Sequence, residues 1–171
     1  KFDHEELYKV FDLCVSCKAC ASECPSNVDV AALKSEFLYQ YQKANGFSWR
    51  NKVFAFNAKL NGLGSITPRF TNFMVNLPLV KKSMGIAPER EVPLLAPQTF
   101  RKWYEKNWNQ APSDSFVNGK VCLFCDEFTN FYDVSVGIDA YELLTTLGYE
   151  VILVDHEESG RAFISKGFLE E

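Results

Sequence analysis

Apolar residues in the first two thirds of the chain recur every three or four positions, which is the spacing of a helix with one buried face. Several of these stretches open on residues that commonly begin a helix, namely Ser26 with Asp29, Ser48, and Thr67 before Pro68. We therefore expect a mostly helical region that buries most of its aromatic side chains. The predicted helices span residues 5–13, 30–44, 48–60, 68–77 and 99–108, and a further short helix ends near Gly85.

The pattern changes in the last third of the chain. Residues 109–119 have the Asn, Pro, Ser and Gly content of a linker. Short apolar runs at residues 120–125 and 149–154 predict two strands, and residues 134–147 predict a helix between them. Strand, helix and strand in this order predict a βαβ unit with parallel strands. The inward positions of its helix would be Val136, Ala140, Leu143, Leu144 and Leu147.

Composition and charge exclude several classes of protein. Of the 171 residues, 47% are hydrophobic and 23% are charged, which is a globular mixture and not that of a disordered chain. No apolar run reaches the roughly 18 residues of a membrane-spanning helix, and no secretory signal opens the chain. The net charge of −4 excludes a globally basic nucleic-acid binder. Charge is nevertheless uneven, at −2 over residues 1–45, +7 over 46–110 and −9 over 111–171, which favours at least two structural units.

Four cysteines lie close together: Cys14, Cys17, Cys20 and Cys24, followed by Pro25. The spacing C-x2-C-x2-C-x3-C-P is the one that bacterial-type ferredoxins use to bind iron–sulfur clusters. Three thiolates separated by two residues can wrap one face of a cubane cluster, and the proline turns the chain so that the fourth thiolate points elsewhere. In two-cluster ferredoxins that fourth cysteine ligates the other cluster. We expect these four cysteines to bind a [4Fe–4S] cluster within a helical ferredoxin-like module.

A disulfide framework and a zinc site are the two alternatives to an iron–sulfur site in this cysteine run. A disulfide framework would spread its cysteines along a secreted chain, which this run does not do. A zinc site usually combines two separated C-x2-C pairs, or Cys with His. The spacing favours iron and sulfur, and a structural zinc-binding or protein-interaction module without a redox role is the alternative that stays open.

The remaining two cysteines, Cys122 and Cys125, lie in the predicted strand over residues 120–125. Residues three apart on a strand face opposite sides, so this pair does not easily share a metal. A thioredoxin-like pair would lie at the start of a helix instead. We expect both side chains to be buried as small hydrophobic groups.

The basic, aromatic-rich middle of the chain, residues 46–110, allows three interpretations. It could bind nucleic acid, dock on an acidic partner or on another part of the same polypeptide, or combine a helical core with a solvated basic face. We favour the last and expect no nucleic-acid partner. No G-x-G-x-x-G follows the first strand, and His4 and His156 are isolated, with His156 in an acidic, solvated loop. The sequence therefore supports neither a nucleotide site nor a catalytic side-chain arrangement.

Residues 13–26 resemble the second cluster motif of the FAD-linked 2-hydroxyacid dehydrogenases, a family that includes glycolate oxidase, D-lactate dehydrogenase and D-2-hydroxyglutarate dehydrogenase. The iron–sulfur part of that family, a separate subunit or a C-terminal region, is similar to one of the subunits of heterodisulfide reductase and continues into cysteine-rich CCG modules. Residues 126–131, 148–151 and 159–161 resemble the start of the first CCG module. The resemblance extends over residues 13–45 and 121–166.

The resemblance implies an α+β fold with two domains. Residues 1–110 would form a helical ferredoxin-type domain with a basic helical extension, and residues 111–171 the βαβ start of a CCG-like module. It also implies electron transfer through the [4Fe–4S] cluster from a flavin that oxidises a 2-hydroxy acid, with the FAD in a flavin domain or subunit absent from this sequence. Since the chain opens on Lys1 and lacks that domain, we expect a piece of a longer oxidoreductase that is inactive alone.

Two features depart from the family pattern. The family has paired cysteines where this chain has Glu158 and Ser159, so that pair has no redox or cluster role here. The other ferredoxin motif is missing upstream, so Cys14, Cys17 and Cys20 would need a fourth cysteine from it. Cys24 would then serve a second cluster that is shared with the absent motif.

The expected surroundings follow from the cysteines and from the absence of an apolar span. Free thiols of low pKa imply a reducing compartment, so we expect a cytoplasmic chain without a transmembrane segment that meets a membrane only through partners. The electron acceptor is not identified by the sequence.

Overall fold

The computed structural model describes residues 3–108 and 117–171, which group into two compact units. Unit 1 comprises Lys1–Asn57 with Gly160–Glu171, and unit 2 comprises Ala58–Ser159. These units differ in extent from the ranges 1–110 and 111–171, which stay a prediction. Most of the predicted linker, residues 109–116, lies outside the described residues.

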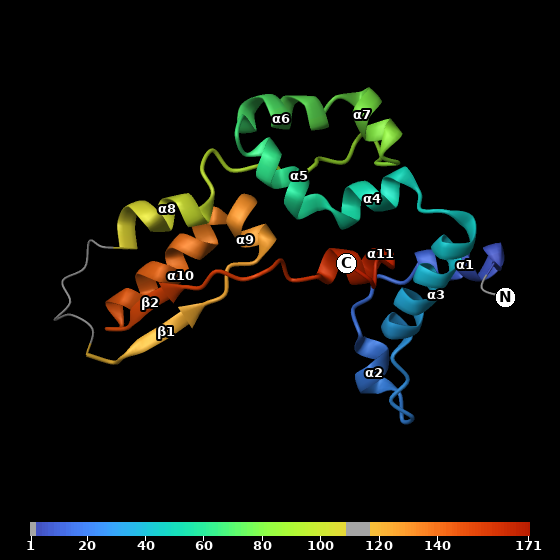
Figure 1. Ribbon diagram of the computed structural model, residues 1–171, viewed down its shortest axis with the longest axis horizontal. Helices are drawn as coiled ribbons and strands as arrows, with labels where there is room; N and C mark the ends of the chain where they lie inside the picture. The colour runs from blue at the N-terminus through green and yellow to red at the C-terminus, as the bar shows by residue number, and fades with distance from the viewer. Residues whose placement is uncertain (1–2, 109–116) are drawn as a thin grey trace. The chain divides into compact units, whose positions relative to one another are not determined.

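Unit 1 is helical (Figure 1). Aromatic pairs join its first and third helices, since Tyr8 stacks on Tyr41 at 4.7 Å and Phe11 lies 5.2 Å from Phe37 between ring centroids. A second cluster centres on Ala55, where the last helix packs against the fourth. The helices are α1 (Glu5–Asp12), α2 (Ala19–Glu23), α3 (Val30–Asn45), α4 (Trp49–Ala55) and α11 (Arg161–Lys166).

The longest helix of unit 1, α3, buries polar as well as apolar side chains. Its N-cap is Asp29, whose carboxylate accepts from the Ala32 amide at 2.9 Å, so the prediction of a capping role for Ser26 is wrong. The Gln42 side chain accepts from Asn51 at 2.8 Å and donates to the Lys166 carbonyl at 2.7 Å. These bonds connect α3 to α4 and α11. The buried residues of α3 are Ala31, Lys34, Ser35, Phe37, Leu38 and Gln42.

Unit 2 contains a two-stranded parallel sheet with helices packed beside it (Figure 1). Strand β1 (Lys120–Leu123) pairs in register with β2 (Glu150–Leu153), and α10 (Val134–Thr146) connects them and packs against β2. The predicted βαβ unit is therefore confirmed. The other helices of this part are α5 (Asn57–Gly64), α6 (Pro68–Val75), α7 (Pro78–Ser83), α8 (Phe100–Asn107) and α9 (Glu127–Phe131).

The core of unit 2 lies between α8, α10 and the sheet. The Tyr104 hydroxyl donates to the Val151 carbonyl at 2.9 Å and accepts from the Leu153 amide at 3.2 Å, which attaches α8 to β2. Gly137 allows a close approach to α8, because a Cβ there would lie 2.8 Å from the Phe100 ring. The buried core residues are Phe100, Tyr104, Cys125, Tyr141 and Val151.

Several local predictions are confirmed and others are wrong. Ser48 and Thr99 cap α4 and α8 through their side-chain oxygens, whereas Thr67 precedes α6 without a side-chain cap. The helix expected over residues 48–60 is interrupted at Phe56, whose φ and ψ of −91° and 26° leave the helical region. An α+β class is thus confirmed, while the ferredoxin-like and CCG-type details stay predictions.

Most aromatic side chains of residues 3–108 are buried or half-buried, but several on the predicted helical stripes are not. Trp49, Phe70 and Phe73 expose about two thirds of their surface. In α6 the inward side is instead polar, since the Asn72 side chain makes two hydrogen bonds with the Leu95 backbone at 2.8 and 2.9 Å. In α10 the buried residues are Gly137 and Tyr141, whereas the predicted inward residues Val136, Leu143 and Leu147 are exposed.

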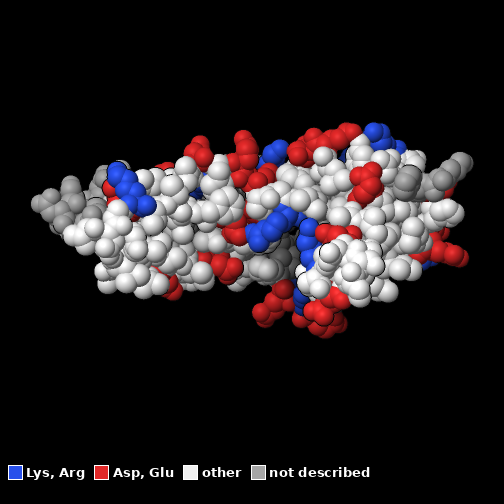
Figure 2. All heavy atoms as spheres, turned by 90° about the horizontal axis from the view of Figure 1, so that it is seen from below, with Lys and Arg blue, Asp and Glu red and all other residues white. Residues whose placement is uncertain are grey.

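The remaining expectations concern the distribution of surface charge and the presence of a membrane-spanning helix. On the face drawn in Figure 2, Lys and Arg side chains lie in separate groups with Asp and Glu among them, as on an ordinary solvated surface. Among residues 3–108 and 117–171, no helix has both the length and the apolar content to cross a membrane.

Candidate functional site

The four-cysteine motif occupies the segment that leads from α1 through α2 to the start of α3. Cys14 follows α1, Cys17 is exposed in the loop, Cys20 lies in α2 and Cys24 is the C-cap of α2. All are free thiols, as the two later cysteines are, so the structure holds no support for a disulfide framework in the described ranges.

The backbone of this segment takes unusual conformations. Ser16, Lys18 and Asn27 have φ values of 57°, 62° and 50°, in the left-handed region that side chains other than glycine seldom enter. Ser16 and Lys18 flank Cys17 on both sides. Such residues reverse the chain over short distances, which lets closely spaced cysteines depart from regular helix or strand geometry.

Backbone N–H groups are directed at two of the sulfurs. The Val30 amide, at the start of α3, donates to Cys20 Sγ at 3.2 Å. Backbone N–H groups of Val28 and then Ser26 lower the pKa of the Cys24 thiol by stabilising its thiolate. Thiolates that accept backbone hydrogen bonds are the form in which cysteine binds iron.

These features fit a thiolate-ligated cluster in donor type. Four sulfur donors lie in one short segment, and the N–H groups around them suit an anionic group. Within the described parts of the chain, however, no three Cys, His, Asp or Glu side chains lie together as metal ligands would. The assignment of Cys14, Cys17, Cys20 and Cys24 as ligands therefore stays a prediction.

A buried lysine also contacts the motif. Lys34 is 8% exposed and its Nζ donates to the Cys14 carbonyl. Because charged residues are rarely buried without a partner, the sequence pattern assigned no role to this residue. The only feature of the sequence that could have pointed to Lys34 is its position one helical turn after Val30.

The second cysteine pair has a different environment. Cys122 is exposed on β1, so the expectation that both residues are buried is wrong for this one. Cys125 follows the strand and is buried, and burial, followed by the nearby Asp126 carboxylate, raises the pKa of its thiol to about 11. That thiol is the small hydrophobic group expected at this position.

The carboxyl end of the sheet carries a buried carboxylate. Glu127 in α9 is 6% exposed and accepts from the Ser159 hydroxyl at 2.6 Å and from its amide at 3.3 Å. Burial, together with the charge of Glu127, raises the pKa of Glu158. Ser159, one of the two residues expected to replace paired cysteines of the family, thus belongs to a carboxylate–hydroxyl contact. The sequence predicted no helix or strand between residues 125 and 134, so it missed both α9 and the burial of Glu127.

His156, in the loop that follows β2, is less solvated than expected. Its ring stacks on Phe124 at a centroid distance of 4.1 Å, and its Nδ1 lies 2.6 Å from the Glu157 carbonyl. These contacts account for the position of the ring.

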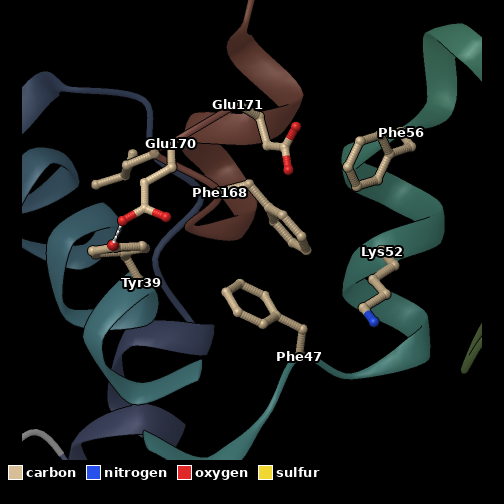
Figure 3. Close-up of a pocket in the computed structure, with 8 residues that line it drawn as sticks. Tyr39, Phe47, Lys52, Phe56, Phe168, Glu170 and Glu171 are labelled. Atoms are coloured by element: carbon tan, nitrogen blue, oxygen red, sulfur yellow. Dashed lines mark hydrogen bonds between the residues drawn. The ribbon is translucent and has the colours of Figure 1, made fainter. Parts of the chain in front are cut away.

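Unit 1 also contains a cavity of about 410 Å³ (Figure 3). Phe47, Phe56 and Phe168 form its apolar wall, and Tyr39 donates to Glu170 at its edge. Tyr39 and then the charge of Lys43 lower the pKa of Glu170. None of the motif cysteines lines this cavity, so it is separate from the candidate cluster site.

Comparison with known proteins agrees with the cysteine motif. Residues 7–28, which contain all four motif cysteines, match the family model of the 4Fe-4S binding domain. No solved structure is significantly similar to this chain.

The similarity to characterised proteins extends over nearly the whole chain. The sequence is 30% identical to D-2-hydroxyglutarate dehydrogenase of Haemophilus influenzae and to that of Escherichia coli, each over 98% of this chain and 17% of the relative. It is 28% identical to the enzyme of Pantoea ananatis over 99% of this chain and 17% of that protein. The chain thus spans about a sixth of the length of these relatives. The predicted resemblance to the iron–sulfur region of FAD-linked 2-hydroxyacid dehydrogenases is therefore confirmed.

Proposed function

We propose that this chain is an electron-transfer region of an FAD-linked 2-hydroxyacid dehydrogenase, with Cys14, Cys17, Cys20 and Cys24 as ligands of a [4Fe–4S] cluster. The single observation that carries the proposal is the match of residues 7–28 to the 4Fe-4S binding domain. Similarity over nearly the whole chain to D-2-hydroxyglutarate dehydrogenases supports the wider context.

Each part of the motif has a distinct task in this proposal. The thiolates hold the cluster, which supplies one-electron redox chemistry when bound. The Val30 N–H donates to Cys20 Sγ, and the N–H groups of Val28 and Ser26 stabilise the thiolate of Cys24. The left-handed residues on both sides of Cys17 let the loop bend around a bound group.

The rest of the reaction lies with other parts of the enzyme. A flavin domain or subunit would oxidise the 2-hydroxy acid and pass electrons one at a time to this region. The relatives' name makes D-2-hydroxyglutarate a candidate substrate. The 171-residue chain by itself would oxidise no 2-hydroxy acid, because the flavin is elsewhere.

The proposal is tested by reconstituting the chain with ferrous iron and sulfide without oxygen, then measuring iron, acid-labile sulfide and the visible spectrum. We expect about four iron and four sulfide per chain and a broad absorption band near ~400 nm. Cys20→Ser should abolish this binding. Cys122→Ser is the matched control, since Cys122 is also a free thiol but lies on β1 outside the motif, and it should bind as much iron as the wild type.

The outcome also decides between the open alternatives. A colourless protein with stoichiometric zinc would overturn the proposal in favour of a structural zinc module. If iron binds only when the upstream motif of the relatives is joined to the chain, Cys24 serves the second cluster. Iron binding by the chain alone assigns Cys24 to this cluster, and Cys24→Ser should then lose iron as Cys20→Ser does.

A further inference from the structure

Lys34 on α3 is a buried cation without a carboxylate partner among the described residues. Its side chain is 8% exposed, and its Nζ contacts the backbone carbonyl of Cys14. None of the ion pairs formed within residues 3–108 and 117–171 includes it. Burying a charge is costly unless an opposite charge compensates it, so the position of Lys34 calls for an anion.

The surroundings of Lys34 are cationic. Burial lowers the pKa of Lys166, and the positive charges of Arg50 and Lys34 lower it further, with Asp12 acting in the opposite direction. Arg50 and Lys166 also lie over the Phe54 ring, at 5.5 and 5.4 Å from its centroid. Lys34 and Arg50 therefore both act on Lys166 as like charges, with Asp12 opposing them.

The same face of α3 is directed at the cysteine motif at two points. Val30 donates its amide hydrogen to Cys20 Sγ, and Lys34, four residues later and one helical turn away, contacts the Cys14 carbonyl. The 16-residue helix thus brings a backbone donor to one sulfur and a full positive charge to the peptide of another motif cysteine.

We propose that Lys34 is a positioning residue that supplies a fixed positive charge beside an anionic group bound by the cysteine motif, and thereby favours the reduced form of that group. The inference rests on the proposed function, because a [4Fe–4S] cluster with four thiolates is the anion concerned. In a reductive titration one electron from dithionite adds one negative charge to the cluster, and Lys34 contributes only its charge.

The direction of the effect follows from electrostatics. A positive charge in a poorly solvated site attracts the more negative, reduced state more strongly than the oxidised state. Lys34 should therefore raise the reduction potential. A neutral side chain of similar length should lower the potential, although the ligands are unchanged.

The test compares reconstituted wild type with Lys34→Met, Lys34→Arg and Lys34→Gln in anaerobic dithionite titrations at pH 7, followed by visible absorption. Lys34→Met and Lys34→Gln should shift the potential to more negative values, and Lys34→Arg should stay near the wild type. Lys34→Gln keeps a hydrogen-bond donor for the Cys14 carbonyl, so it separates charge from hydrogen bonding. Lys43→Met is the matched control on the same helix, because Lys43 is exposed, and it should leave the potential unchanged.

Thermal unfolding gives a readout that is independent of the potential. Removing an uncompensated buried cation should leave the apo chain of Lys34→Met at least as stable as the apo wild type. Loading with iron and sulfide should then raise the unfolding temperature of Lys34→Met less than that of the wild type. The unfolding temperature of Lys43→Met should rise on loading by as much as that of the wild type.

The outcomes separate this inference from the proposed function. A wild type that binds no iron, either alone or joined to the upstream motif of the relatives, would overturn the proposed function and this inference with it. Loaded Lys34→Met or Lys34→Gln with the wild-type potential would overturn the role of Lys34 and leave the cluster intact. If Lys34→Met fails to fold or load, the potential of Lys34→Gln decides the question.

Discussion

The same C-x2-C spacing occurs in two regions of the chain, and the surroundings of the cysteines have opposite effects on thiol pKa in the two regions. Cys14 and Cys17 are separated by two residues, as Cys122 and Cys125 are. In the first region the backbone is left-handed on both sides of Cys17 and backbone N–H groups lower the pKa of Cys24. In the second, a strand leaves Cys122 exposed, and burial raises the pKa of Cys125 to about 11.

The contrast shows that C-x2-C spacing alone does not predict reactive or metal-binding cysteines. The local backbone and the burial of the thiol decide whether it ionises. Thiolates bind metals and react with electrophiles, and they form where N–H groups or positive charges stabilise them. In the motif segment the backbone N–H groups of Val28 and Ser26 lower the pKa of Cys24 in this way. The segment around Cys125 has an apolar core instead, which favours the neutral thiol.

The largest expected difference between the two regions is in thiol reactivity. At pH 7 a thiol with a pKa of about 11 is ionised in about one molecule in ten thousand, and the Cys125 side chain is buried as well. In the apo chain, Cys24 should therefore react with iodoacetamide at least ~100-fold faster than Cys125. Peptide mass spectrometry over time measures both rates. In urea the two rates should converge, and equal rates in the folded chain would contradict the comparison.

The next difference concerns stability of the apo chain. Cys125→Ser places a hydroxyl among Phe100, Tyr141 and Val151, and we expect it to lower the free energy of unfolding by about 1–3 kcal/mol. Cys24→Ser changes a partly exposed residue at the end of α2 and should leave the stability of the apo chain nearly unchanged. Urea unfolding followed by circular dichroism measures both. A larger loss for Cys24→Ser would show that its thiol is part of the packed structure.

The elements that sequence patterns predicted well are those with long repeats or clear ends. Helix α3 has 16 residues of helical spacing, and β1 and β2 are apolar runs on either side of a helix. Short helices such as α9 and α11, with five and six residues, are too brief for a periodic signal. Their caps, Asp126 and Gly160, follow a strand and a loop in which turn residues are also common.

Burial was harder to predict than secondary structure. Leu33 belongs to the apolar stripe of α3 and is exposed, whereas Lys34 and Gln42 on the same helix are buried. The reason is that these polar groups find partners from distant parts of the chain, at the Cys14 carbonyl and the Lys166 carbonyl. The expected cysteine ligands rest on spacing alone, whereas Lys34 and Glu127 become visible only in the folded chain.

The smallest expected effects are on stability, when the N-cap carboxylates of α9 and α3, Asp126 and Asp29, are removed. Asp126→Ala removes the oxygen that accepts from the Thr129 amide at 2.8 Å, and it should cost about 1 kcal/mol of unfolding free energy. Asp29→Ala removes the corresponding bond to the Ala32 amide at 2.9 Å and the ion pair with Lys18 at 3.1 Å. Both variants should melt below the wild type at pH 7, as differential scanning calorimetry would measure.

The contribution of the Asp29 carboxylate to stability should also depend on pH, and it should decrease as the pH falls. The Ala32 amide, followed by Lys18, lowers the pKa of Asp29 below its ordinary value of 3.8. A carboxylate whose pKa is lower in the folded than in the unfolded state stabilises the fold above the ordinary value, and this contribution is lost as the pH falls through the folded value. The difference in melting temperature between wild type and Asp29→Ala should therefore be constant near neutral pH and shrink below about pH 3.8. A difference that grows on acidification would contradict the capping role of this carboxylate at the start of α3.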